Sequence, residues 1–301
     1  MTTFKELEVE DTEQFGFAAK PPIQLFEDQL DSLDEQFQDT FFNCLSISIH
    51  FKTIIALYGS TLKLVSVDQL NKLITESDAA EQKISLLDLQ NDKNIKSIDV
   101  SGYGTISQIS LNGSENLLFV AYGDSSKAQN KLGYVEVSKL VNSGEFTINE
   151  FKTFDSAIVS IIPNPYHNDW CAVTLEDESC HIFKSLVAAE CDTFPHASAI
   201  CWLNREGFAV ADSDNLHLEV FNGDEKSTLE LKDGISSDTG SMKPYHLSQI
   251  DDDHLLVICA DSLLLEPEEC ANFSFIVKFT IPTEVITSTD VVYHLNDFQY
   301  D

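Results

Sequence analysis

The sequence predicts an all-β fold in which one short unit recurs about five times. The first copy, residues 45–67, has the form of three short strands joined by tight polar turns. Its first strand alternates Leu45, Ile47 and Ile49 with serines, so we expect one apolar face and one polar face. Its second strand, residues 54–57, is apolar throughout, which is typical of a strand covered on both faces. Repeated units of this form predict the blades of a β-propeller.

The spacing of the copies also favours a propeller. The middle strands begin at Ile54, Leu117, Trp170, Phe208 and Leu255, at intervals of 63, 53, 38 and 47 residues. Propeller blades repeat every ~40–50 residues, so the last three intervals fit and the first one contains an insertion. No copy has the Gly-His and Trp-Asp signature of WD40 repeats, so we expect degenerate, WD40-like blades.

The remaining elements follow the same order along the chain. We expect the second to fifth copies at residues 106–137, 158–183, 199–221 and 246–279, and a further strand at 291–295. Around the first copy we expect a helix at 68–74 with Asp68 as its N-cap, then outer strands at 83–89 and 95–100. A β-sandwich is the main alternative, and its strands vary more in order and burial than these units. A single helix near this position also disfavours an α/β fold.

The chain divides into two parts by composition. Residues 1–40 form an acidic, extended lead-in with a mobile start, and residues 41–301 form the propeller. We expect the lead-in to dock at its two apolar clusters, residues 15–17 and 23–26, and to contain a short helix at 27–37.

The charge of the chain limits its partners. Asp and Glu number 50 against 18 Lys and Arg, a formal net charge of -32. Such a surface repels nucleic acids and anionic lipids, and it favours basic protein partners, cations or simple solubility. No segment approaches the ~18 apolar residues of a membrane span, and no secretory signal precedes the lead-in. Seven scattered cysteines fit reduced, buried thiols of an intracellular protein.

Motifs for catalysis and for cofactor or metal binding are missing from the sequence. It contains no phosphate-binding loop, HExxH, CxxC or nucleophile elbow. Cys180 and His181 are adjacent in a strand and point to opposite faces, so core packing is the better reading. His246 and His254 flank three aspartates in a hairpin tip, and the acidic run beginning at Asp212 reads as a turn rather than a calcium loop. We therefore expect no enzyme activity, no cofactor and no metal.

Acidic residues gather in the turns between the second and third strands of the units. In a propeller these turns lie on one face, where they would form an acidic rim that attracts a basic partner. Lys127 and Lys131 are the only basic residues among them. Acidic turns can also serve only solubility and protect sheet edges from pairing. The candidate partner-binding residues are Asp124, Glu176, Asp177, Glu178, Asp212, Asp214, Asp261, Glu266, Glu268 and Glu269.

Scattered segments resemble one nucleoporin family. They are residues 13–17, 45–49, 55–59 and 64–70, then 158–183 with Asn164-Pro165, and finally 199–203 with 207–211. Together they resemble the N-terminal propeller of the cytoplasmic-face FG-nucleoporin that docks the DEAD-box mRNA-export helicase, over most of residues 13–295. The family's propeller has seven blades and is followed by FG repeats and a coiled coil. This chain has about five to six readable blades, so it looks like a truncated or divergent member that lacks its last blade or blades.

The resemblance implies a function. It implies a non-enzymatic docking module in the nucleus, at the cytoplasmic face of the nuclear pore complex, that promotes mRNA export and mRNP remodelling. Its partners would be the basic surface of the helicase's N-terminal RecA-like domain and other nucleoporins, without direct nucleic-acid binding or membrane insertion. Occupying that cationic RNA-binding surface would hinder RNA rebinding.

Two other functions stay open. One is an acidic propeller scaffold for another basic protein, such as a histone-like chain. The other is a propeller hydrolase or lyase with a metal in the central channel, which would need carboxylates or histidines on the inner strands. The expected inner strands offer mostly hydroxyls, which disfavours the hydrolase: Ser46, Ser48, Ser107, Ser160 and Ser248, with His50 and His246 at strand ends.

Overall fold

The computed structural model describes residues 44–72, 95–123, 130–186, 191–212, 217–230, 242–251, 254–261, 272–278 and 291–294. Three expected elements lie outside these residues: the lead-in of residues 1–40, its helix at 27–37 and the outer strand at 83–89. Within the described ranges, no helix has the length and apolar character required to cross a membrane.

The described strands form five four-stranded antiparallel sheets, each built from consecutive strands. The first sheet contains β1 (Leu45–Ser48), β2 (Thr53–Tyr58), β3 (Thr61–Ser66) and β4 (Lys96–Asp99). The second contains β5 (Thr105–Leu111), β6 (Leu117–Gly123), β7 (Lys131–Glu136) and β8 (Asn149–Thr153). The third contains β9 (Ile158–Pro163), β10 (Cys171–Leu175), β11 (Cys180–Phe183) and β12 (Cys191–Phe194). The fourth contains β13 (Ala197–Trp202), β14 (Gly207–Asp212), β15 (His217–Asn222) and β16 (Glu225–Glu230). The fifth contains β17 (Met242–Asp251), β18 (His254–Asp261), β19 (Asn272–Lys278) and β20 (Val291–His294).

These sheets confirm the five predicted units and add an outer strand to each. The outer strand β4 was expected at 95–100, whereas β8, β12 and β16 were not expected. They carry no apolar periodicity because they lie at the outer edge of each sheet, where most of their residues are exposed or half-buried. The strand at the C-terminal end, β20, pairs with β19 and completes the fifth sheet. The strand expected at 291–295 is therefore confirmed, and it belongs to the fifth sheet.

Helical segments occur in the connections. Helical backbone at 67–72 confirms the expected helix, but Asp68 lies within its first turn, so the prediction of Asp68 as the N-cap was wrong. The short α4 (Val137–Ser143) was not expected, and it buries only Val137 and Leu140. A left-handed Gly144 ends α4 by donating its N–H to the Leu140 carbonyl. A 3₁₀ turn, η2 (Ser101–Tyr103), leads into β5.

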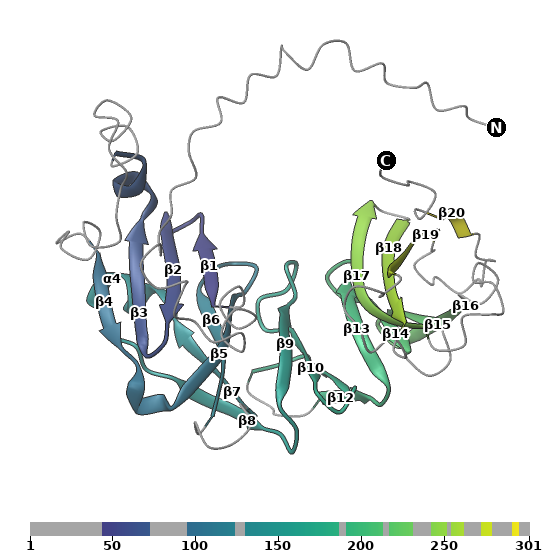
Figure 1. The fold of residues 1–301 in the computed structure, drawn as a ribbon, viewed down its shortest axis with the longest axis horizontal. Coiled ribbons are helices and arrows are strands. Elements are labelled where there is room, and N and C mark those ends of the chain that lie inside the picture. Colours follow the sequence, from purple (N-terminus) through teal and green to yellow (C-terminus); the bar gives the residue numbers. More distant parts are fainter. Residues whose placement is uncertain are drawn as a thin grey trace, which may run out of the picture.

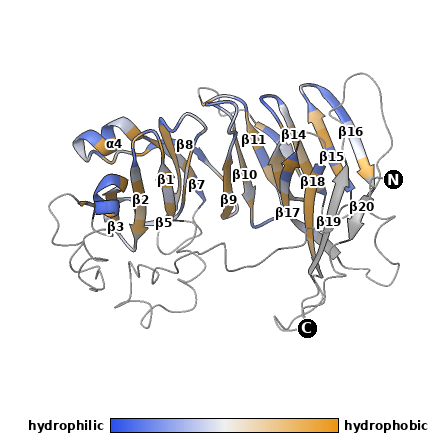
Figure 2. Ribbon diagram, turned by 90° about the horizontal axis from the view of Figure 1, so that it is seen from above, coloured by the Kyte–Doolittle hydropathy of each residue, from blue (hydrophilic) through white to orange (hydrophobic). Residues whose placement is uncertain are grey.

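The sheets follow one another along an arc, with the first and fifth sheets at its two ends (Figure 1). The first strands of neighbouring sheets contact each other, β1 with β5, β5 with β9 and β13 with β17, so these are the inner strands of the arc. Apolar residues follow the strands and polar residues follow the turns (Figure 2). This radial packing of sequential meanders is that of propeller blades.

The second strand of each middle sheet divides its side chains between two neighbouring sheets. In β6, Leu118 and Val120 pack in the cluster shared with the first sheet, whereas Phe119 and Ala121 pack in the cluster shared with the third. The same division recurs in β10 and β14. Because successive strand residues point to opposite faces, a strand between two sheets must be apolar at every position. This explains the uninterrupted apolar runs in the sequence.

The first strand buries its polar side. The side chains of Leu45 and Ile47 in β1 are 49% and 56% exposed, whereas Ser48 is fully buried. The Ser48 hydroxyl donates to the Glu115 carboxylate at 2.6 Å, which explains how a polar side chain is accommodated between two sheets. The alternation is present, but its apolar side faces away from the second sheet.

Candidate partner-binding face

The two ends of the strands form two edges of the arc. We call the edge with the β2–β3, β6–β7, β10–β11 and β14–β15 turns the acidic edge. We call the opposite edge, with the β1–β2, β5–β6, β9–β10 and β13–β14 turns, the latched edge. Alternate turns of an antiparallel meander lie at opposite ends, so each sheet contributes to both edges.

At the latched edge, hydrogen bonds join the turns of neighbouring sheets. The Glu115 carboxylate of the second sheet accepts from the Ser48 hydroxyl at 2.6 Å and the His50 N–H at 2.7 Å, both from the first sheet. The buried Asn112 donates to the Asn168 carbonyl of the third sheet at 3.1 Å. The buried Asn164 of the third sheet donates to the Arg205 carbonyl of the fourth sheet, also at 3.1 Å. These amides and this carboxylate tie four sheets together.

At the acidic edge, hydrogen bonds join the chain beside the turns of the first three sheets to a linker of the same sheet. The Val100 N–H donates to the Ser60 carbonyl in the first sheet, and the Phe154 N–H donates to the Asn130 carbonyl in the second, each at 2.9 Å. In the third sheet the Glu176 N–H donates to the Ala157 carbonyl, again at 2.9 Å. The turns are therefore held in place while their side chains remain available.

Among the described turns of this edge, the β10–β11 turn presents the strongest acidic feature. Glu176 and Asp177 are exposed and Glu178 is half-buried. The Asp177 carboxylate accepts from the Ser179 hydroxyl at 2.6 Å and from its N–H at 3.1 Å, which fixes the turn. Glu178 adopts a positive φ of 64°, a conformation that tight turns require. Within the described ranges, no ion pair involves Glu176 or Asp177, so both charges face solvent.

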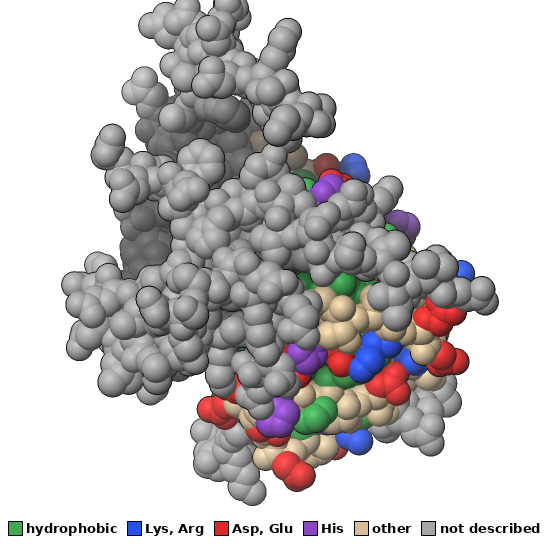
Figure 3. All heavy atoms as spheres, turned by 90° about the vertical axis from the view of Figure 1, so that its right-hand side faces the viewer, with side chains coloured by type: hydrophobic (Ala, Val, Ile, Leu, Met, Phe, Trp, Pro, Cys, Tyr) green, Lys and Arg blue, Asp and Glu red, His purple; other side chains and the backbone are tan. Residues whose placement is uncertain are grey.

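Asp212, in the fourth sheet, is only half-exposed and has a histidine neighbour. Its carboxylate lies 3.6 Å from His217 Nε2, and Glu219 lies 3.8 Å from the same nitrogen. Lys226 Nζ also contacts Glu219 at 2.7 Å. Viewed from the end of the arc where the fifth sheet lies, the described surface mixes carboxylates with lysines and histidines (Figure 3). The charge of this described surface is therefore less uniform than the acidic turns of the sequence suggested.

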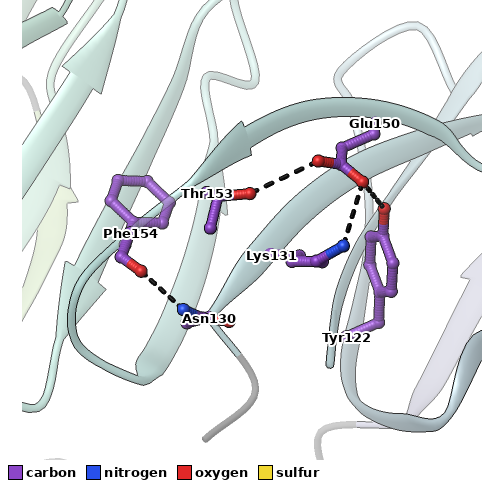
Figure 4. Close-up of polar contacts among 6 residues, drawn as sticks. All are labelled: Tyr122, Asn130, Lys131, Glu150, Thr153 and Phe154. Carbon is purple, nitrogen blue, oxygen red and sulfur yellow. Dashed lines mark hydrogen bonds and ion pairs between the residues drawn. The ribbon is translucent and has the colours of Figure 1, made fainter. Parts of the chain in front are cut away.

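In the second sheet the predicted basic residue Lys131 is neutralised. The Glu150 carboxylate accepts from Lys131 Nζ at 3.3 Å, from the Tyr122 hydroxyl at 3.1 Å and from Thr153 Oγ1 at 3.3 Å (Figure 4). The hydrogen bond from Lys131, followed by that from Tyr122, lowers the pKa of Glu150. Sequence reasoning missed Glu150 because it lies in the unexpected outer strand β8.

The remaining predicted site residues are described in part or not at all. Asp261 ends β18, where only its backbone is described. The second basic residue, Lys127, lies outside the described residues, as do Asp124, Asp214, Glu266, Glu268 and Glu269. The structure thus brings together the β10–β11 acids and Asp212 at one edge of two neighbouring sheets.

Side chains considered for catalysis or metal binding lie elsewhere. Cys180 is fully buried in the cluster between the third and fourth sheets, while His181 points to the other face and contacts Ser179 and Thr193. Burial, the largest effect, lowers the pKa of His181. At the latched edge His254 pairs with Asp251 at 2.7 Å. Among the described side chains, no three metal-binding groups cluster.

Solved structures show what this arrangement resembles. The N-terminal domain of Nup159 matches with a TM-score of 0.58 and 14% identity, over 85% of this chain and 61% of that one. A structure of an S. cerevisiae Dbp5 variant bound to Nup159, a Gle1 variant, IP6 and ADP matches with a TM-score of 0.54 and 12% identity, over 82% and 59%. The β-propeller domain of Myceliophthora thermophila Cps50 (Swd1) matches with a TM-score of 0.50 and 10% identity, over 84% and 70%.

At these identities the likeness establishes the fold alone, and the chain is a β-propeller protein. No protein-family model and no curated protein matches the sequence. The chain spans 61% and 59% of the two Nup159-related chains. The fold expected from the nucleoporin resemblance is confirmed, and any nucleoporin function remains a proposal.

Proposed function

We propose that the chain is a non-enzymatic docking module of the nuclear pore's cytoplasmic face, which binds the N-terminal RecA-like domain of a DEAD-box helicase. Binding would use the acidic edge and would promote mRNA export and mRNP remodelling. The structural likeness to the Nup159 N-terminal domain, and to a structure in which Dbp5 is bound to Nup159, supports this choice of partner. The observation that carries it is the exposed β10–β11 turn with Glu176 and Asp177.

Electrostatics favours this turn as the first point of contact. Glu176 and Asp177 form no ion pair within the described ranges, and Lys131 at the same edge is neutralised by Glu150. An exposed pair of carboxylates on a chain of net charge -32 steers a cationic surface toward it at long range. Charges of this kind affect the association rate and specificity more than the intrinsic affinity.

The mechanism is competition. The helicase surface that binds RNA phosphates is cationic, so carboxylates that occupy it compete with RNA for the same charges. Binding to the acidic edge would then slow the return of released RNA.

The test is charge reversal at this turn. We expect Glu176→Lys combined with Asp177→Lys to weaken binding of the helicase N-terminal domain about tenfold at low salt, which is roughly 1.4 kcal/mol. The dependence of log Kd on log salt should flatten as well. Fluorescence anisotropy over a salt series measures both quantities.

A matched control keeps the charge change and moves it to the latched edge. Glu206 and Asp224 are exposed in the β13–β14 and β15–β16 turns, which a hydrogen bond joins at that edge. Glu206→Lys combined with Asp224→Lys should change the Kd less than twofold. Equal losses in both double variants would show that only the net charge matters.

A scaffold for another basic protein would use the same edge. It would give no helicase binding in the unaltered protein and a Glu176-dependent complex with a different cationic protein. The described residues offer no observation that favours the propeller hydrolase.

A further inference from the structure

The first sheet has one covered face and one open face. Ile55, Leu57, Leu62 and Leu64 pack against the second sheet and are buried. The opposite face belongs to the end of the arc, with no further described sheet beyond it (Figure 1). In the second sheet, by contrast, β6 has both faces buried between neighbours.

Strand register defines the side chains of the open face. Leu45 lies opposite Ala56, which lies opposite Lys63, forming one cross-strand row. Ile47 lies opposite Ile54, which lies opposite Val65, forming a second row. Directly opposed residues share a face of the sheet. We call these two rows the open face.

The open face is apolar yet accessible to solvent. Leu45 and Ile47 are 49% and 56% exposed, Ile54 and Ala56 are half-buried, and Val65 is buried. The second strands β6 and β10 of the middle sheets are, by contrast, buried at nearly every position. An accessible apolar sheet face of this kind marks a docking site.

Lys63 adds a charge requirement to the open face. It lies in the Leu45 row between Ala56 of β2 and Ser97 of β4, and burial lowers its pKa, which means that its charge is partly removed from water. No ion pair to Lys63 occurs among the described residues. A ligand that combines apolar side chains with a carboxylate would therefore match this face better than a purely apolar one.

The chain itself contains such a segment. Residues 23–28 read Ile-Gln-Leu-Phe-Glu-Asp, an apolar cluster followed directly by two carboxylates. Asp28 is 17 residues before Leu45, a stretch that spans up to roughly 55 Å when extended. A short tether of this length gives an effective concentration on the order of millimolar.

We infer that residues 23–28 dock on the open face of the first sheet, with the apolar cluster over Leu45, Ile47 and Ile54 and with Glu27 or Asp28 paired to Lys63. The segment covers the end of the arc in place of a neighbouring sheet. A second copy of the chain is the weaker occupant, because two molecules of net charge -32 repel each other.

Photocrosslinking tests this inference on the full chain. The photoreactive amino acid p-benzoylphenylalanine at position 47, where it replaces Ile47, should crosslink to residues 15–28 of the same molecule. A mixture of ¹⁴N and ¹⁵N protein, analysed by mass spectrometry, separates crosslinks within one molecule from those between copies. Crosslinks between copies, or to no residue of the lead-in, would overturn the inference.

Two sets of variants test the chemistry of the contact. Leu25→Ser with Phe26→Ser should lower the crosslink yield at least threefold, whereas the control Leu7→Ser with Val9→Ser, nearer the N-terminus, should leave it unchanged. Lys63→Glu should lower the yield about threefold, and Glu27→Lys with Asp28→Lys in that background should restore it. Equal yields in all variants would show that the contact is nonspecific.

Helicase binding separates this inference from the proposed function. The open face lies at the end of the arc and the acidic edge at the turns, so Leu25→Ser with Phe26→Ser should leave the helicase Kd within twofold of the unaltered protein. Loss of the crosslink with unchanged helicase binding would confirm that the two surfaces act independently. Loss of both would contradict that independence.

Discussion

The two edges of the arc use polar residues in opposite ways. At the latched edge, hydrogen bonds between neighbouring sheets engage the side chains of Asn112, Asn164 and Glu115. At the acidic edge, Glu176 and Asp177 project into solvent from a turn that its own sheet holds in place. The chain thus separates structural polar groups from those available for binding. Substitutions at the latched edge should change stability, and those at the acidic edge should change association.

The largest effect is expected at Asn164. Its side-chain amide donates to the Arg205 carbonyl and accepts from the Tyr166 N–H at 2.7 Å, and the residue is fully buried. Asn164→Ala leaves these backbone groups without their partner, so we expect a loss of about 2–3 kcal/mol in the free energy of unfolding. Urea denaturation measures this loss. A loss under 0.5 kcal/mol would show that the latch does not hold the sheets.

A smaller effect is expected where two turns of the latched edge approach closely. A Cβ at Gly113 would collide with the Pro165 carbonyl of the next sheet. We expect Gly113→Ala to cost about 1–3 kcal/mol, because backbone cannot move aside as a flexible side chain can. Gly102→Ala is the control, since a Cβ there meets nothing within 4 Å. The difference between the thermal unfolding midpoints of Gly113→Ala and Gly102→Ala measures how closely Gly113 approaches Pro165.

The smallest effect is a pH dependence at Glu115. Burial would raise the pKa of Glu115, but hydrogen bonds from Ser48 and His50 outweigh it and lower the pKa below its ordinary value of 4.5. A lowered carboxyl pKa stabilises the fold above pH ~4.5, and this stability is lost as the pH falls through the folded-state pKa. We expect Glu115→Gln to cost about 0.5 kcal/mol at pH 7, a figure already reduced for solvent screening, and progressively less as the pH falls below 4.5.

Unfolding at several pH values measures the Glu115 contribution. The stability curves of the unaltered protein and Glu115→Gln should approach each other as the pH falls below 4.5. Parallel curves would mean that the carboxylate contributes no charge-dependent bond across the first two sheets.

The middle strands could be predicted because of where they lie. Strands such as β6 and β14 are packed between two sheets, and that position demands apolar residues throughout. The outer strands β8 and β16 have few neighbours to constrain their residues, so they leave no pattern in the sequence. Helix α4 offered one usable signal, Gly144 at its end, but only two of its residues are buried.

The candidate site could be predicted only as far as local sequence determines it. Acids in a tight turn, such as Glu176 and Asp177, are recognisable because turns favour polar residues. Their electrostatic neighbours come from distant strands: Glu150 neutralises Lys131 from β8, and His217 meets Asp212 from β15. Tertiary pairing decides which charges remain available, and no local pattern encodes it. The exposure of β1 is another case, because alternation fixes two faces and not which of them is covered.

The division of β6 between two clusters limits how this chain can change in length. Inserting one residue into β6 would exchange the side chains of Leu118 and Phe119 between opposite faces. The packing of both adjoining hydrophobic clusters would then be lost. Additional residues in a surface turn shift no such register. Insertions and deletions should therefore accumulate in the loops, which accounts for a repeat interval that ranges from 38 to 63 residues while the strands keep a common pattern.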